Sequence, residues 1–237
     1  MTDVEEGPFV DLPVDPGTTR PPRTGYLLAM LSHGYPYSAT AEETLRSLSQ
    51  AIDRPPDFAV YYHDGPGVAF VAKEASEYQA VSGGAQIGFC GATRALWTQA
   101  ARAATDRGIS YVLWVEHDFR FLRPFRVRDL VLVLRDAQIA QVSLMREPTG
   151  REAKEGGVLR GAFVADDGYV VHSRYFTTNP SLMRTSFMRQ NPFPDFDAEC
   201  EGRFGLDLVD RGYRFAVAGD GVDAWVEHFG TRNGFGY

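Results

Sequence analysis

The chain has 237 residues, of which 44% are hydrophobic and 23% charged, the composition of an ordinary globular protein. This length is enough to bury a full core, and it favours one large α/β domain over two small ones. The formal net charge of -7 at pH 7 gives no overall attraction to nucleic acid or to anionic lipid. No apolar run approaches the ~18 residues that a membrane-spanning helix needs, so we expect no membrane span. The acidic, proline-rich start lacks the apolar region of a signal peptide, so we expect a cytoplasmic protein.

The first half of the chain predicts alternating strands and helices. Residues 1–24 are expected to form an extended arm. The elements that follow are a strand over 26–31, a helix over 40–52, a strand over 58–62, a helix over 93–107 and a strand over 111–115. Strand–helix–strand units are parallel with a right-handed crossover, so the carboxyl ends of these strands should meet at one edge of the sheet, where open α/β sheets bind ligands.

The strand over 111–115 ends in Glu116, His117 and Asp118. Side chains alternate along a strand, so Glu116 and Asp118 should point to one side and His117 to the other. Two carboxylates at the carboxyl edge of a sheet provide the hard oxygen ligands that suit Mg²⁺ or Mn²⁺. The stretch therefore predicts a metal site, although acidic residues also commonly close a strand as solvated charges.

The second half of the chain continues with further helices and strands. In order, these are a helix over 127–136, a strand over 140–145, strands over 170–172 and 175–178, helices over 182–189 and 201–211, and short strands over 215–218 and 224–226. Residues 147–168 are rich in charge and glycine, and so long a connection without periodicity is expected to be a lid over the site.

The chain contains two cysteines, Cys90 and Cys200, far apart in sequence and without the spacing of metal ligands. This usage suits a reducing compartment, and it argues against both a zinc site and a disulfide framework.

The order of these features resembles the inverting, family-two-like glycosyltransferases of the GT-A fold, which include small stand-alone enzymes, some of them viral. The resemblance covers roughly residues 26–230 and lies in the order of several short motifs. The corresponding positions are Asp64 after the second strand, Glu116-His117-Asp118 for an Asp-x-Asp-like motif, Thr93-Arg94 where Arg-Asn is usual, Cys200-Glu201 ahead of Gly212-Tyr213, and the late His228.

The resemblance implies an α/β fold built on a GT-A-like, Rossmann-type nucleotide-binding sheet that is mostly parallel and flanked by helices. It implies a single catalytic domain over 25–237, with a nucleotide-sugar-binding half over 25–120 and an acceptor-binding half over 121–237.

The resemblance also implies roles for the matching residues. The donor would be bound by Ser32, His33, Asp64, Arg94 and Glu116. A Mn²⁺ or Mg²⁺ ion would be held by Asp118 and His228, with Glu116 as a further ligand. The catalytic base would be Glu201, and Glu199 is close enough in sequence to compete with it, because Cys200 stands where the family often has an acid.

The implied activity is transfer of a sugar, with inversion, from a nucleotide-sugar donor such as a UDP-sugar to a hydroxyl of a glycan, a protein or a modified nucleobase. A nucleotidyltransferase is one alternative, but it would normally show a Gly-rich, Lys-containing signature after the first strand, which Ser32-His33-Gly34 lacks. A catalytically silent nucleotide-sugar-binding module is the other.

Overall fold

The computed structural model describes residues 25–33, 38–66, 77–146, 164–166, 168–219 and 223–230. The expected arm over 1–24 and most of the expected lid over 147–168 lie outside these described residues. Within them, no helix combines the length and the apolar character that crossing a membrane requires.

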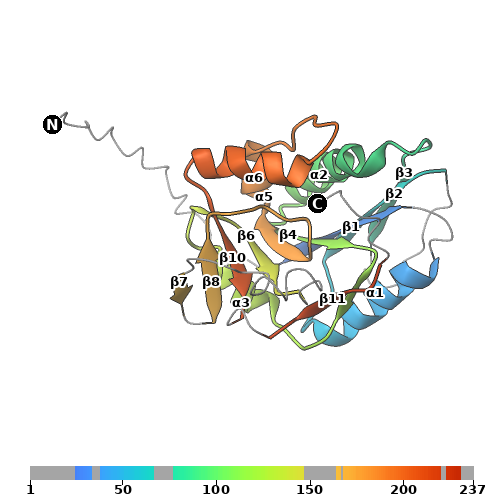
Figure 1. The fold of residues 1–237 in the computed structure, drawn as a ribbon. Helices are drawn as coiled ribbons and strands as arrows, with labels where there is room; N and C mark the ends of the chain where they lie inside the picture. Colours follow the sequence, from blue (N-terminus) through green and yellow to red (C-terminus); the bar gives the residue numbers. More distant parts are fainter. Residues whose placement is uncertain are drawn as a thin grey trace.

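A nine-stranded sheet forms the centre of the described chain (Figure 1). Its strands are β1 (Tyr26–His33), β2 (Phe58–Asp64), β3 (Tyr78–Ser82), β4 (Tyr111–Glu116), β6 (Ile139–Leu144), β7 (Val164–Asp166), β8 (Tyr169–His172), β9 (Ser181–Arg184) and β10 (Arg214–Ala218). They lie in the order β3-β2-β1-β4-β9-β6-β10-β8-β7. Neighbours from β3 to β4 pair in parallel, as do β6 and β10, while β9 is inserted antiparallel between β4 and β6.

Helices cover both faces of this sheet, as Figure 1 shows. The helices are α1 (Ser38–Ala51) and α3 (Val127–Val133) on one face, and α2 (Gly88–Asp106), α5 (Thr185–Gln190) and α6 (Cys200–Asp210) on the other. Strand β1 is apolar and buried on both sides, so Leu28 and Met30 join the core under α1, while Leu27 and Ala29 join the core under α2. The prediction of a mostly parallel α/β sheet flanked by helices is confirmed.

A second, two-stranded sheet lies beside the main one and consists of β5 (Phe119–Phe121) and β11 (Val226–His228) in antiparallel pairing. Helix α1 anchors the turn that leads into β5. The hydroxyl of Thr44 donates to the backbone oxygen of His117 at 2.6 Å, and the backbone N–H of Phe121 donates to the hydroxyl of Ser47 at 3.1 Å. This small sheet fixes the residues directly after β4.

Several predicted elements differ from the structure. Residues 181–184 form β9, not the start of a helix, because insertion between β4 and β6 overrides the local helical pattern. The predicted strand over 175–178 is irregular. Helix α2 begins at Gly88, five residues before the predicted start, because the Asp64 carboxylate accepts hydrogen bonds from the N–H groups of Ile87 and Gly88.

Cys90 and Cys200 form a disulfide, with their Cα atoms 5.8 Å apart. The prediction against a disulfide is wrong. The two residues are separated by 110 positions, but each lies in the first turn of a helix on the same face of the sheet, α2 for Cys90 and α6 for Cys200. Sequence spacing does not show this proximity, because it arises from the packing of the two helices.

Reduction of this disulfide should lower the free energy of unfolding by about 2–4 kcal/mol, because the bond closes a long loop in the unfolded chain. Guanidinium unfolding with and without dithiothreitol measures the change. A Cys90→Ser, Cys200→Ser double variant is the control, and its unfolding midpoint should not respond to the reductant. Two free thiols in the native, non-reduced protein would contradict the disulfide.

Candidate active site

Four predicted site residues, Ser32, His33, Asp64 and Glu116, end their strands at the carboxyl edge of the main sheet. Strand register places Leu31 of β1 beside Glu116 of β4, and His33 of β1 beside Asp64 of β2. Because β9 runs antiparallel to β4, the first residue of β9, Ser181, lies beside Trp114 at this same edge. The segment before β9 therefore approaches the residues that follow β4.

Asp118 and His228 meet at this edge. Oδ2 of Asp118 lies 3.1 Å from Nε2 of His228, and the two side chains are 11% and 8% exposed. The β5–β11 pairing brings them together, since His228 is the partner of Phe119, and the N–H of Phe229 donates to the backbone oxygen of Asp118 at 3.0 Å. Strand β4 ends at Glu116, so Asp118 lies in a turn and the predicted alternation of side chains does not extend to it.

The charge states at this pair follow from burial and neighbours. Burial raises the pKa of Asp118, but the hydrogen bond with His228 and the nearby histidines outweigh it and hold the pKa below its ordinary value. Burial lowers the pKa of His117 to about 4, so this imidazole is neutral at physiological pH. An ionised carboxylate therefore lies beside the neutral imidazole of His117.

The pair fits a divalent cation. Adjacent ligands of an octahedral ion with bonds of ~2.1 Å stand roughly 3 Å apart, close to the observed separation. Oδ1 of Asp118 is also buried without a hydrogen-bond partner in the described part of the chain. Within that part no three His, Cys, Asp or Glu side chains come together as a complete metal site, so Glu116 as a third ligand stays a prediction. An ion bound by one carboxylate and one imidazole would take its other ligands from phosphate and water.

Gly230 leaves room for the Asp118 carboxylate, because a Cβ atom at Gly230 would lie 2.1 Å from Oδ2. Gly230→Ala should displace this carboxylate and weaken Mn²⁺ binding by about 10- to 100-fold, the range seen when the supports of a metal ligand are lost. Isothermal titration with Mn²⁺ measures the change. Gly202→Ala, on α6 with nothing within 4 Å of the added Cβ, is the matched control. Equal Mn²⁺ affinities in the two variants would refute this role for Gly230.

Ser32 and His33, predicted to bind the donor, end β1 beside two further histidines. Ser32 is buried, and its hydroxyl lies 3.1 Å from Nδ1 of His63. The ring of His33, which is exposed, meets the ring of His117 edge to face at 4.7 Å. These side chains line the edge next to Asp118.

Asp64 and Arg94 are engaged within the protein. Both carboxylate oxygens of Asp64 accept backbone N–H groups at the start of α2, at 2.8 and 3.0 Å. Arg94, in α2, forms an ion pair with Asp195 at 2.5 Å. Their predicted contacts with the donor stay predictions, and Asp64 has a clear structural role in starting α2.

Glu201 and Glu199, the two predicted bases, have different surroundings. Glu201 is 9% exposed, and its Oε1 accepts hydrogen bonds from the N–H and the hydroxyl of Thr178 at 2.5 and 2.8 Å. Glu199 is exposed and adopts a left-handed backbone conformation, with φ of 53°, just before α6. Only Glu201 is held in a defined position by neighbours that the structure describes.

Two contacts link Glu201 to the carboxyl edge that carries Asp118. Only two residues separate Thr178, which binds Glu201, from β9, and β9 begins at this edge. Arg146, whose charge acts on Glu201, forms a β-bridge with Val226 of the strand that carries His228. Sequence reasoning missed Thr178 and Gly230, since neither belongs to a motif and both act through contacts distant in sequence.

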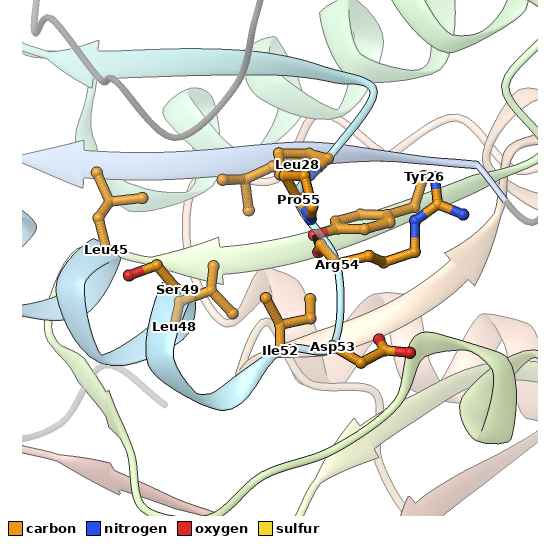
Figure 2. A pocket seen from close by; sticks show the side chains of 10 residues that line it. Tyr26, Leu28, Leu45, Leu48, Ser49, Ile52, Asp53, Arg54 and Pro55 are labelled. Carbon is orange, nitrogen blue, oxygen red and sulfur yellow. Dashed lines mark hydrogen bonds between the residues drawn. The ribbon is translucent and has the colours of Figure 1, made fainter.

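A cavity of 220 Å³ lies at the opposite edge of the sheet (Figure 2). Tyr26, at the start of β1, lines it together with Leu45 of α1 and the turn before β2. Its polar groups bind one another or nearby backbone: the Tyr26 hydroxyl donates to the backbone oxygen of Arg54, and the Arg54 side chain pairs with Asp57. We assign no ligand to this cavity.

Comparison with known proteins supports the fold. No protein-family model matches the chain, and no curated protein matches it in sequence. The crystal structure of S. aureus TarS, a GT-A-type glycosyltransferase, is similar with a TM-score of 0.54 and 12% sequence identity. The match covers 87% of this chain but only 37% of the TarS chain. At this identity the likeness shows a distant glycosyltransferase-like fold.

Proposed function

We propose that this protein is a metal-dependent glycosyltransferase that moves a sugar from a nucleotide-sugar donor to an acceptor hydroxyl with inversion. The observation that carries the proposal is the Asp118–His228 pair at the carboxyl edge of a glycosyltransferase-like sheet. In the segment before β9, Thr178 holds the buried carboxylate Glu201. A metal-binding pair and a fixed base are the two parts that this reaction requires.

Each group has one task in the proposed mechanism. Asp118 and His228 would hold Mn²⁺ or Mg²⁺, which, when bound, neutralises the charge that develops on the departing diphosphate. Glu201 takes the proton of the acceptor hydroxyl as that oxygen attacks the anomeric carbon. Attack from the face opposite the diphosphate breaks the bond to the leaving group in the same step, so the configuration inverts.

The substrates follow from the resemblance and the charge. The proposed donor is a UDP-sugar, as in the family that the motifs resemble. The acceptor hydroxyl belongs to a glycan, a protein or a modified nucleobase, and the net charge of -7 favours the first two over DNA. The expected cytoplasmic location stays a prediction. A reducing cytosol keeps thiols reduced, so in that compartment the disulfide between Cys90 and Cys200 would be open.

A thermal-shift panel of nucleoside diphosphates and nucleotide-sugars, with and without Mn²⁺, tests the proposal. A ligand that binds the native state raises the melting temperature, and we expect UDP and a UDP-sugar to do so only with the metal. Donor turnover with Mn²⁺ then separates an enzyme from a silent binding module. Release of pyrophosphate from a nucleoside triphosphate, without turnover of any nucleotide-sugar, would instead indicate a nucleotidyltransferase.

A further inference from the structure

We infer that Thr178 is a positioning residue that orients the Glu201 carboxylate for proton transfer; this inference rests on the proposed function. Both hydrogen-bond donors of Thr178, its N–H and its hydroxyl, reach the same oxygen, Oε1, at 2.5 and 2.8 Å. Two bonds to one oxygen hold the carboxyl group in one orientation and direct Oε2 away from Thr178. Oε2 is then the atom that receives the proton of the acceptor.

The segment that carries Thr178 is irregular but firmly fixed. The buried side chain of Gln141, in β6, binds it from one side: Oε1 of Gln141 accepts the N–H of Thr177 at 3.0 Å, and Nε2 donates to the backbone oxygen of Thr177 at 2.8 Å. Helix α6 lies against it from the other side, so close that a Cβ at Gly205 would stand 2.7 Å from the N atom of Phe176. Thr178 is therefore held against α6, the helix on which Glu201 lies.

These contacts also act on the acidity of Glu201. Burial raises its pKa above the ordinary value, while hydrogen bonds from Thr178 and Thr177 oppose this rise. Arg146, which follows β6, carries a positive charge that lowers the pKa of Glu201 as these hydrogen bonds do. Removal of the Thr178 hydroxyl should raise the pKa of Glu201 further. Because the base must be ionised, the activity would then be lost at a higher pH as the pH is lowered.

Two variants separate this role from a packing role. Thr178→Val keeps the shape and the backbone N–H but removes the hydroxyl, while Thr178→Ser keeps the hydroxyl. With saturating UDP-sugar donor and Mn²⁺, we expect Thr178→Val to lower the kcat of donor turnover by roughly 10- to 100-fold. This is the range for loss of one hydrogen bond to a charged group. The KM for the donor should be unchanged, and the acidic limb of the kcat profile should move to higher pH. Thr178→Ser should restore both quantities.

A measurement that does not need turnover completes the test. The carboxyl carbon of Glu201, assigned in ¹³C NMR spectra by its absence in Glu201→Gln, should titrate at a higher pH in Thr178→Val than in the wild type or Thr178→Ser. An unchanged titration, or a kcat loss of equal size in Thr178→Ser, overturns the inference. A shifted titration in a protein that turns over no nucleotide-sugar leaves the contact intact but refutes the proposed function.

Discussion

Replacing Asp118 with asparagine should abolish the dependence of donor binding on Mn²⁺ and reduce transfer by roughly 10²- to 10⁴-fold, because a bound ion supplies several kcal/mol of charge stabilisation to the leaving group. Asparagine keeps the size of the side chain but removes the charge that attracts a cation. The fold should survive, since the change removes a buried charge and adds no volume. The melting temperature with UDP, with and without Mn²⁺, measures metal-dependent binding.

Asp129→Asn is the matched control for this experiment. Asp129 is an exposed acid on α3 that pairs with Arg126, the residue before this helix, and exposed pairs contribute little to stability. This variant should keep the wild-type response to Mn²⁺ and its turnover. An Asp118→Asn protein whose donor binding still depended on Mn²⁺ would place the ion elsewhere.

Glu201→Gln should leave donor and metal binding intact but lower turnover by the ~10²- to 10⁴-fold typical of a lost general base. The amide oxygen of glutamine still accepts hydrogen bonds from Thr178, so the side chain keeps its position, but it no longer takes a proton. Because burial raises the pKa of Glu201, wild-type kcat should fall as the pH is lowered through that raised pKa. Glu201→Gln should lose this acidic limb together with most of its activity.

Glu199→Gln is the control for the base, and it should retain nearly full turnover, because Glu199 is exposed and precedes the helix that carries Glu201. The anomeric configuration of the product, read from its proton NMR coupling constants, should be opposite to that of the donor. Loss of turnover in Glu199→Gln alone would assign the base to Glu199. A product of retained configuration would exclude direct displacement.

The sheet edge was predictable because its residues follow local patterns. The apolar runs of β1, β2 and β4 are long enough to be buried parallel strands, and the parallel crossover rule places their ends together. Asp118 was predicted from the acidic end of its strand and His228 from the resemblance, and the structure places them 3.1 Å apart. Their proximity supports the assignment of a shared site without testing their roles.

The parts that could not be predicted depend on contacts distant in sequence. The residues of β9 have a helical sequence pattern. They form a strand only because the fold places them between β4 and β6. The disulfide likewise depends on the packing of α2 beside α6. Thr178 is recognisable only from its bonds to Glu201, twenty-three positions further along the chain.

The β5–β11 pairing joins two residues of the proposed metal site that are made at very different times during synthesis. Asp118 and His228 lie about 110 residues apart, so a ribosome adding 5–20 residues per second finishes the second partner roughly 5–20 s after the first. The parallel pairing of β1, β2 and β4 needs only residues made before Asp118. A nascent chain can therefore begin to build its sheet while it still lacks half of the pair. If the proposed site is correct, an unfinished chain cannot complete it before His228 is made.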